Sequence, residues 1–289
     1  MSDRVIAIVF DFDETLGPDT ISFFLENQGI KPADFWKEID GMVKNDWDPP
    51  LAYMHKMLEM FYQKGNLDLS KSALQKAGKK LKLYPGLPQA LGELKTFAAT
   101  EPSLKQVRIS LEFYIISGGF EEMIRSTKIA GEVDGIFGCN FSYDKSGVPN
   151  GVKTAISFTE KTRYLHGIRK GIDASILRSD PYRINDAIPT DEQRVPFSNM
   201  IYIGDGPSDI PCLSNVVSGG GAGIGASAPF GTFKKGYELA RGKRITVGPY
   251  TANYKKGSDM RKVLEETILR VGLQIGMESR KNVIGTPGH

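Results

Sequence analysis

One stretch near the amino terminus indicates both the fold and a site, and it reads Val5-Ile6-Ala7-Ile8-Val9-Phe10-Asp11-Phe12-Asp13-Glu14-Thr15-Leu16. Its first six residues are apolar and uncharged, which is typical of a strand buried on both faces in a parallel sheet covered by helices. Asp11 and Asp13 follow at i, i+2 spacing, so in an extended chain their side chains point to the same side. Because ligands of open α/β sheets bind at the carboxyl ends of strands, the stretch predicts a ligand site there.

A second acidic turn follows another apolar segment. Met200-Ile201-Tyr202-Ile203 runs into Gly204-Asp205-Gly206-Pro207-Ser208-Asp209. If the two strands lie side by side, Asp205 meets Asp11 and Asp13 at one edge of the sheet, where three hard oxygen donors and water suit Mg²⁺. Softer metals would recruit His or Cys. The alternative, that these aspartates only cap helices, is less favoured because two such turns both follow apolar strands.

Composition excludes several classes of protein. The 289 residues include 37 Lys and Arg and 34 Asp and Glu, and a net charge of +3 is too small to argue for nucleic acid or an anionic membrane as partner. The two cysteines, Cys139 and Cys212, cannot form a disulfide framework and indicate a reducing compartment. The start of the chain does not resemble a signal peptide, and no apolar run reaches the length of a membrane span. We therefore expect a soluble, cytoplasmic protein.

Most of the chain between residues 17 and 100 has helical periodicity. The helical segments comprise 21–27, 32–44, 49–64, 70–83 and 87–98. Residues 53–62 are rich in methionine and aromatic side chains, which we interpret as the core of a helical bundle rather than a ligand surface. Because strands resume after residue 100, the sequence predicts an α/β fold. It has a Rossmann-like parallel-sheet core of residues 1–16 and 101–289, with an inserted all-helical cap domain of residues 17–100.

The rest of the chain alternates between strand and helix patterns. Strands are predicted at 109–116, 135–141 and 245–247, a hairpin turn at 143–151, and helices at 120–129, 159–170 and 259–271. The glycine-rich run 219–225 does not follow the first strand of a βαβ unit, so a tight turn and short strand are favoured over a dinucleotide site. The polar segment 173–199 is interpreted as an excursion on the surface of the sheet, and 278–289 as a loose tail.

A serine and two glycines end the second predicted strand. Ser117-Gly118-Gly119 precedes a predicted helix, so it offers a hydroxyl and free backbone N–H groups at the positive end of that helix. Such a turn can bind phosphate. By itself the motif is weak, and a helix N-cap is the more common explanation.

Together these segments resemble the four ordered motifs of the haloacid dehalogenase superfamily. The motifs are Asp-Phe-Asp-Glu-Thr-Leu (11–16), Ile-Ser-Gly-Gly (116–119), a downstream lysine, and Gly-Asp-Gly-Pro-Ser-Asp (204–209). The first and fourth are specific, and the other two are supportive. The phosphoserine-phosphatase-like branch, which has a helical cap after the first motif, is the most similar.

The resemblance implies a role for each aspartate. Asp11 would be the nucleophile that takes the phosphoryl group as an aspartyl-phosphate, and Asp13 would protonate the leaving oxygen and later deprotonate water. Mg²⁺ would be held by Asp11, the main-chain carbonyl of Asp13 and Asp205, with Asp209 supporting that loop. The dehalogenases of the superfamily lack the second aspartate of the first motif, so Asp13 argues against halide displacement.

The resemblance also implies that Ser117, Gly118 and a lysine bind the phosphoryl oxygens. Lys161 would begin a helix that packs on the sheet and is the favoured candidate. Lys153, beside the predicted turn, is the alternative. Lys170 ends the same helix, where a cation is favoured by the helix dipole.

These observations indicate a Mg²⁺-dependent phosphatase that acts on a small phosphorylated metabolite, a phosphomonoester. A phosphotransferase or phosphomutase with the same nucleophile, or a non-catalytic phosphate-binding module, is the alternative. Phosphoserine phosphatases use a cap glutamate nine positions after the nucleophile to hold the substrate amine, and here that position is Thr20. Asp19 or Glu26 could still meet an amine such as that of phosphoserine, phosphoethanolamine or phosphocholine. The sequence does not indicate an oligomeric state.

Overall fold

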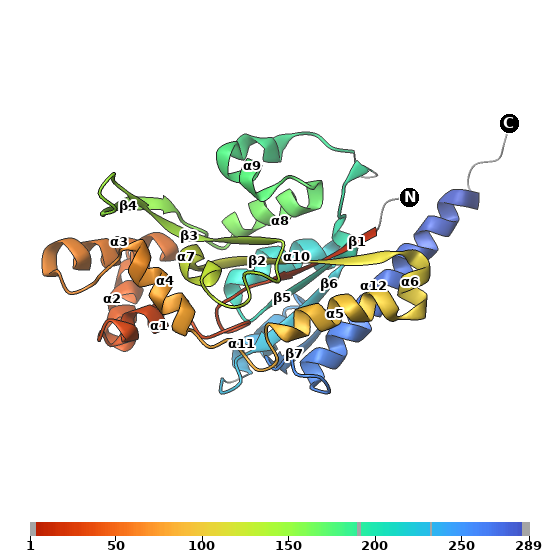
Figure 1. Cartoon of the computed structure of the whole chain (residues 1–289), viewed down its shortest axis with the longest axis horizontal. Coiled ribbons are helices and arrows are strands. Elements are labelled where there is room, and N and C mark those ends of the chain that lie inside the picture. Colours follow the sequence, from red (N-terminus) through yellow and green to blue (C-terminus); the bar gives the residue numbers. More distant parts are fainter. Residues whose placement is uncertain (1–3, 190–191, 232, 285–289) are drawn as a thin grey trace.

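The computed structural model describes residues 4–189, 192–231 and 233–284, and its described part is organised around one seven-stranded sheet (Figure 1). The strand order is β4-β3-β2-β1-β5-β6-β7, and neighbouring strands run parallel except the antiparallel pair β3 and β4. The strands are β1 (Arg4–Phe10), β2 (Ile109–Phe120), β3 (Gly135–Tyr143), β4 (Pro149–Thr154), β5 (Met200–Gly204), β6 (Ala222–Ser227) and β7 (Val247–Thr251). The predicted parallel-sheet core and the hairpin turn after residue 143 are confirmed.

Strand β1 lies in the middle of the sheet, between β2 and β5. Phe10 is opposite Ile115 of β2 and Ile203 of β5, and the backbone N–H of Asp11 donates to the carbonyl of Ile203 at 2.9 Å. The carboxyl ends of the three strands therefore meet at one edge, as predicted for the two acidic turns.

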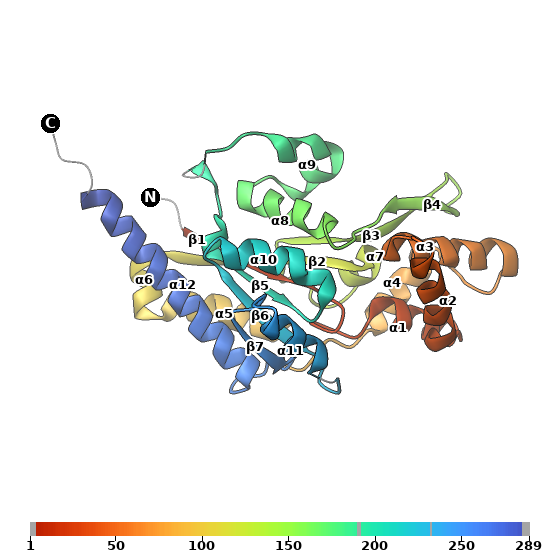
Figure 2. The ribbon, with the colours of Figure 1, turned by 180° about the vertical axis from the view of Figure 1, so that it is seen from behind.

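Helices cover both faces of the sheet. Helix α5 lies in front of it in Figure 1, and α10 lies in front of it in Figure 2, which shows the molecule from behind. Helix α5 packs against β2, and α10 packs against β5 and β6. The helices outside the insertion described below are α5 (Gln89–Thr100), α6 (Pro102–Val107), α7 (Glu121–Arg125), α8 (Glu160–Lys170), α9 (Ala174–Ser179), α10 (Ile210–Ser218), α11 (Lys234–Arg241) and α12 (Asp259–Ile284).

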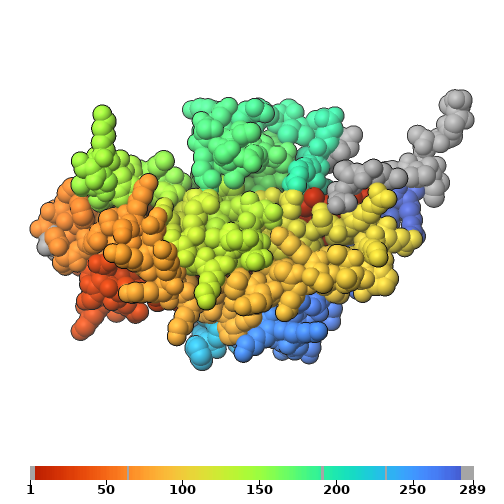
Figure 3. Space-filling view, viewed as in Figure 1, coloured from red at the N-terminus to blue at the C-terminus, as the bar shows by residue number. Residues whose placement is uncertain are grey.

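A group of helices is inserted between β1 and β2, and we call residues 20–80 the helical insertion. It consists of α1 (Thr20–Asn27), α2 (Pro32–Lys44), α3 (Pro49–Glu59), a π-helix (Met60–Lys64) and α4 (Lys71–Lys80). Figure 3 shows it, in red to orange, packed directly against the core. At Gly78 of α4 an added Cβ would lie 2.3 Å from the carbonyl oxygen of Met123 in α7. The insertion and the core are therefore in close contact.

Helix α5 belongs spatially with the sheet. It packs against β2, α6 and α12, and the Lys95 ammonium lies 5.3 Å from the centre of the Phe113 ring of β2. The cap domain of residues 17–100 stays a proposal, and this packing favours an end of the cap before residue 89.

The interpretation of residues 53–62 as a bundle core is confirmed for the methionines but not throughout. Met54 and Met57 are fully buried. Tyr62 is instead 59% exposed, and its hydroxyl donates to the carbonyl of Pro149 in β4. Tyr62 therefore lies at the surface between the insertion and the hairpin.

Several predicted boundaries are wrong. The last strand spans Val247–Thr251 rather than 245–247, because an edge strand tolerates Gly248 and Pro249. Helix α12 continues to Ile284 rather than 271, so residues 278–284 are helical and not a tail. Residues 285–289 lie outside the described part.

Packing against α6 explains why α12 continues past residue 271. An added Cβ at Gly272 would lie 2.2 Å from Leu104 of α6, and one at Gly276 would lie 2.8 Å from Val107. The segment from 173 to 199, which was interpreted as an excursion on the surface of the sheet, contains α9 and 3₁₀ turns at Pro181–Asn185 and Phe197–Asn199. Within the described ranges, no helix is long and apolar enough to cross a membrane, and the cytoplasmic location stays a prediction.

Candidate active site

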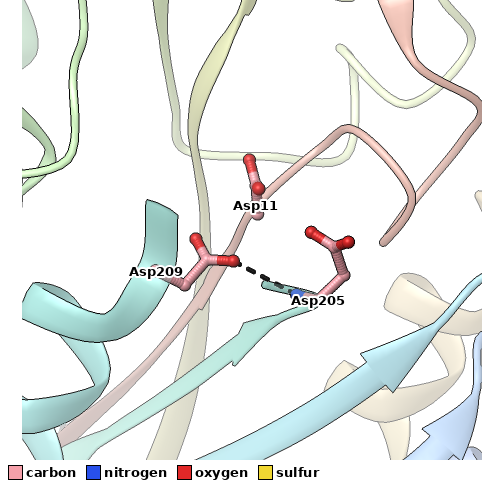
Figure 4. A group of neighbouring side chains, drawn as sticks. All are labelled: Asp11, Asp205 and Asp209. Atoms are coloured by element: carbon pink, nitrogen blue, oxygen red, sulfur yellow. Dashed lines mark hydrogen bonds between the residues drawn. The ribbon is translucent and has the colours of Figure 1, made fainter. Parts of the chain in front are cut away.

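Three carboxylates meet at the carboxyl edge of the central strands (Figure 4). Oxygen atoms of Asp11, Asp205 and Asp209 all lie within 4.8 Å of one another. Asp11 directly follows β1, Asp205 directly follows β5, and Asp209 ends the 3₁₀ turn that leads into α10. The two acidic turns predicted to meet are therefore adjacent.

Asp209 organises the loop after β5. Its Oδ1 accepts hydrogen bonds from the Lys161 ammonium at 2.8 Å and the Tyr202 hydroxyl at 2.8 Å. Its Oδ2 accepts from the backbone N–H groups of Asp205 at 3.1 Å and Gly206 at 3.3 Å. A carboxylate has about four lone-pair sites. These four donors use all of them, so Asp209 is better suited to holding the loop than to binding a ligand directly.

Lys161 is a buried cation beside this cluster. Its side chain is 1% exposed, and its Nζ lies 2.8 Å from Asp209 and 3.1 Å from Asp11. A buried ammonium requires such partners, because removing it from water costs several kcal/mol. Lys153 is exposed on β4, and Lys170 donates to the carbonyls of Ile184 and Asp186. The structure therefore brings Lys161, among the three candidate lysines, to the carboxylates.

The carboxylates exceed the positive charge beside them. Burial, followed by the charge of Asp209, raises the pKa of Asp11 to about 7, although Lys161 opposes this shift. Burial and Asp209 likewise raise the pKa of Asp205 to about 6. A further cation beside Asp11 and Asp205 would lower both pKa values and favour ionised carboxylates at neutral pH. Hard oxygen donors in this number suit Mg²⁺.

Asp13 is held apart from the three-carboxylate cluster, on the side of the helical insertion. Its Oδ1 accepts from the backbone N–H of Thr20 at 2.8 Å, and the Ser117 hydroxyl donates to its Oδ2 at 3.4 Å. Burial, followed by the charges of Asp19 and Asp11, raises the pKa of Asp13 well above its usual value. This environment favours a protonated carboxyl group that has a proton to donate.

The loop of Ser117, Gly118 and Gly119 contacts Asp13, but its predicted relation to a helix is wrong. Strand β2 continues to Phe120, and α7 begins at Glu121 and contains only five residues. The backbone N–H of Gly119 donates to the Ser117 hydroxyl at 2.9 Å. The register of β2 against β3 shifts between Ile116 and Phe120. An irregularity within the strand, rather than a helix terminus, therefore shapes this loop.

Solved structures with the same arrangement of elements identify the fold. A phospho-aspartyl intermediate analogue of phosphoserine phosphatase is 17% identical over 91% of this chain and 99% of that one, with a TM-score of 0.52. A probable phosphoserine phosphatase from Vibrio cholerae is 16% identical over 95% of this chain and 67% of that one, with a TM-score of 0.51. The chain has a haloacid dehalogenase fold.

A haloacid dehalogenase family hydrolase from Salmonella enterica serovar Typhi is also similar. It is 16% identical with a TM-score of 0.51, and the match covers 78% of this chain but only 63% of that one. Among curated proteins, an uncharacterized protein from Borreliella burgdorferi is 25% identical over 244 residues, which is 74% of this chain and 80% of that protein. No family model matches the chain.

Within this haloacid dehalogenase fold, the two candidate amine-binding residues lie at opposite ends of α1. Asp19 is the N-cap, and its carboxylate accepts from the backbone N–H of Ser22 at 2.6 Å. It lies close enough to Asp13 to raise the pKa of that residue. Glu26 is exposed near the other end of the helix. The structure therefore brings Asp19, and not Glu26, to the aspartates.

Sequence reasoning missed two further charged residues near the site. Lys235 of α11 places its ammonium 3.3 Å from Asp205. Glu14 adopts a left-handed backbone conformation with φ of 57°, and its carboxylate accepts from the backbone N–H of Asp19 and the hydroxyl of Tyr84. Glu14 lies within the quoted first motif and could have been found there. The sequence pattern of α11 contains no signal that separates Lys235 from surface lysines.

Tyr202 was also missed, and here a signal was present. It lies in the apolar strand β5, fully buried, and donates to Asp209. Because a buried tyrosine hydroxyl usually finds a polar partner, a tyrosine two residues before the glycine-aspartate turn predicts a contact with that turn.

Proposed function

We propose that the protein is a Mg²⁺-dependent phosphatase that hydrolyses a small phosphomonoester through an aspartyl-phosphate on Asp11. The observation that carries this proposal is the ammonium of Lys161 between Asp11 and Asp209, with Asp205 beside them. Similar structures named phosphoserine phosphatase, one of them a phospho-aspartyl intermediate analogue, support it. Screening a panel of phosphorylated metabolites for phosphate release, with and without Mg²⁺, tests it.

The donor set fits a divalent cation. Asp11 and Asp205 would hold Mg²⁺, together with the main-chain carbonyl of Asp13, and the charge of the ion would oppose the burial and the repulsion from Asp209 that raise the pKa values of Asp11 and Asp205. When bound, the ion would screen the negative charge of the phosphoryl group and polarise its oxygens. Asp209 would hold Asp205 in place through the backbone bonds described above.

The residues of the chain can divide the reaction between them. Asp11 supplies the carboxylate that attacks phosphorus, and Lys161 holds that carboxylate and offers its charge to the phosphoryl oxygens. Asp13 gives its proton to the departing oxygen and later takes one from the water that attacks the aspartyl-phosphate. Ser117 and the backbone of Gly118 would contact the phosphoryl oxygens from the neighbouring strand.

The helical insertion would act as a cap that excludes water and selects the substrate. Asp11 is only 4% exposed, and the backbone N–H of Thr20 from α1 of the insertion donates directly to Asp13. Closure of such an element protects a reactive intermediate from side reactions. We propose residues 17–100 as the cap, and the packing of α5 against β2, α6 and α12 favours an end of the cap before residue 89.

The charges around the site favour a substrate with an amine. Together with burial, the charge of Asp19 raises the pKa of Asp13, and the charges of Asp205, Glu14 and Asp19 raise the pKa of Lys235 although its burial opposes this shift. A cationic group on the substrate would offset these carboxylates. We therefore propose an amine-bearing phosphomonoester, of which phosphoserine and phosphoethanolamine are examples.

Amide substitutions separate the metal ligand from the proton donor. Asp205→Asn is expected to weaken Mg²⁺ binding roughly tenfold or more, because the charged carboxylate ligand is replaced by a neutral amide, and even changes to the partners of a ligand lower metal affinity by that factor. Asp13→Asn is expected to leave Mg²⁺ binding nearly unchanged, because only its main-chain carbonyl is assigned to the ion, yet slow turnover by roughly 10²- to 10⁴-fold. Calorimetric titration of both variants with Mg²⁺, beside phosphate release, measures this. If Asp13→Asn abolishes binding and Asp205→Asn does not, the two roles are exchanged.

A second pair of variants tests the amine. Asp19→Asn keeps an N-cap acceptor for α1 but removes the charge, so it is expected to lower the preference for phosphoethanolamine over ethyl phosphate about fivefold. The preference is the ratio of the two kcat/KM values. Glu26→Gln, at the exposed end of the same helix, is the matched control and is expected to leave the ratio unchanged. An unchanged ratio in both variants would remove the amine hypothesis, and a change in Glu26→Gln alone would assign the contact to Glu26.

A further inference from the structure

The side chain of Tyr53 connects the helical insertion with the loop after Ser117. Tyr53 lies on α3 and is 6% exposed. Its hydroxyl donates to the carbonyl of Gly118 and lies 3.5 Å from the sulfur of Cys139. Burial raises the pKa of this phenol well above its usual value, so it stays a hydrogen-bond donor at physiological pH. A residue of the helical insertion thus donates a hydrogen bond to the backbone of the loop of Ser117, Gly118 and Gly119, which is proposed to bind phosphate.

The carbonyl of Gly118 lies where the sheet is irregular. The register between β2 and β3 shifts between Ile116 and Phe120, so the strand does not continue a regular ladder at Gly118. Buried backbone carbonyls need a donor, and Tyr53 supplies one here. The orientation of this carbonyl is therefore set by a side chain from another part of the chain.

Fixing that carbonyl also fixes the next N–H group. The carbonyl of Gly118 and the N–H of Gly119 belong to one planar trans peptide, so they point in opposite directions. On one side of the peptide, the carbonyl accepts a hydrogen bond from the Tyr53 phenol. On the other side, the N–H of Gly119 donates to the Ser117 hydroxyl at 2.9 Å. That hydroxyl in turn donates to Asp13 at 3.4 Å. One chain of hydrogen bonds runs from Tyr53 to Asp13.

There is little room for this peptide to rotate independently. An added Cβ at Gly119 would lie 2.3 Å from the Thr20 hydroxyl and 2.7 Å from a carboxylate oxygen of Asp13. Only glycine fits between α1 and the Asp13 carboxyl group. A shift of the peptide would therefore displace the side chains of Asp13 and Thr20 directly.

The same helices hold Asp13 from its other side. The Tyr53 ring packs edge-on against Trp36 at 5.9 Å, and the Trp36 indole N–H donates to the Ser22 hydroxyl of α1 at 2.8 Å. At the start of α1, the N–H of Thr20 donates to Asp13 at 2.8 Å. The two oxygens of Asp13 are thus oriented by the insertion, one directly and the other through Tyr53 and Ser117.

We propose that Tyr53 is a positioning residue that couples the docking of the helical insertion to the alignment of the Gly118–Gly119 peptide, Ser117 and Asp13. This inference rests on the proposed phosphatase function. When the insertion is docked, the phenol sets the peptide, and the Ser117 hydroxyl is directed toward Asp13. When the insertion moves away, the peptide loses this donor, and the chain of hydrogen bonds is broken.

Tyr62 offers a matched control from the same part of the chain. It lies in the π-helix that follows α3, and its hydroxyl donates to a core carbonyl, that of Pro149, at 2.5 Å. Its acceptor belongs to β4, at the edge of the sheet, rather than to the loop beside Asp13. Both bonds join the insertion to the core, but only the bond of Tyr53 ends at the proposed site.

The experiment compares Tyr53→Phe with Tyr62→Phe in the full chain. With p-nitrophenyl phosphate and saturating Mg²⁺, Tyr53→Phe is expected to lower kcat about tenfold, the effect of one hydrogen bond to a buried group, with KM changed less than kcat. Tyr62→Phe is expected to stay within about twofold of the unchanged protein in both constants. Hydrogen exchange of metal-free protein gives a readout independent of activity, in which Tyr53→Phe alone should speed exchange in peptides covering residues 117–120.

The outcomes separate this inference from the proposed function. If the unchanged protein releases no phosphate from any phosphomonoester of the panel, the proposed function fails and this inference fails with it. If the unchanged protein is active, but Tyr53→Phe and Tyr62→Phe have the same kcat and the same hydrogen-exchange rates, only the role of Tyr53 is overturned. Equal losses of kcat in both variants, accompanied by equal losses of thermal stability, would show that both tyrosines only hold the insertion on the core. This result would also overturn the proposed role of Tyr53.

Discussion

Replacing Asp11 with asparagine is expected to reduce phosphate release by roughly 10⁴-fold or more while leaving the fold intact. An amide is nearly isosteric with the carboxylate but is a poor nucleophile. The fold should tolerate the change, because the amide oxygen can still accept the bond from the N–H of Phe12, and Lys161 keeps Asp209 as a partner. Phosphate release and circular dichroism, measured on the same preparation, check both parts of the prediction.

The control for this substitution is Asp40→Asn, which makes the same change at an exposed position on α2. It is expected to keep the activity of the unchanged protein. Substantial turnover by purified Asp11→Asn would contradict the assignment of Asp11 as nucleophile. A loss of helical signal in Asp11→Asn would instead assign the residue a structural role.

Replacing Lys161 with methionine is expected to abolish turnover and to lower the free energy of unfolding by about 3–5 kcal/mol. The methionine fills a similar volume, but Asp11 and Asp209 are then left buried without their shared cation. Urea unfolding monitored by circular dichroism measures the free energy, and phosphate release measures the activity.

Lys153→Met is the matched control, because this lysine was the other candidate for the phosphate-binding role. Its side chain is exposed on β4, so we expect a change within about 0.5 kcal/mol and normal turnover. If Lys153→Met is inactive and Lys161→Met is active, the phosphate-binding lysine is Lys153, and the contacts of Lys161 are structural only.

The parts of the site that could be predicted from the sequence are those fixed by strand ends. An apolar run followed by aspartates gives both the strand and the side on which its last carboxylates lie, which is why Asp11 and Asp205 were found to be neighbours. The helix that carries Lys161 was predicted from its periodicity, and its apolar side indicated which lysine would face the sheet.

Contacts between distant segments could not be predicted in this way. Neither the bond from Tyr53 to Gly118 nor the ion pair of Lys235 with Asp205 leaves a periodic signal, because each depends on how two separately folded parts are docked. The length of β2 was missed for a related reason. Ser117-Gly118-Gly119 was interpreted as a turn into a helix, whereas pairing of Phe120 with Cys139 of β3 keeps the segment in the sheet.

The central position of β1 has a consequence for how the chain folds during synthesis. β1 is the first strand to be made, yet its two neighbours are β2 and β5, which begins at residue 200. At a synthesis rate of 5–20 residues per second, about 10 to 40 seconds pass between β1 and β5. Throughout this interval at least one apolar edge of β1 lacks its native partner, and such edges pair with other chains. The strand that precedes the proposed nucleophile therefore has an unpaired apolar edge until residue 204 has emerged, and we expect the nascent chain to depend on chaperones during this interval.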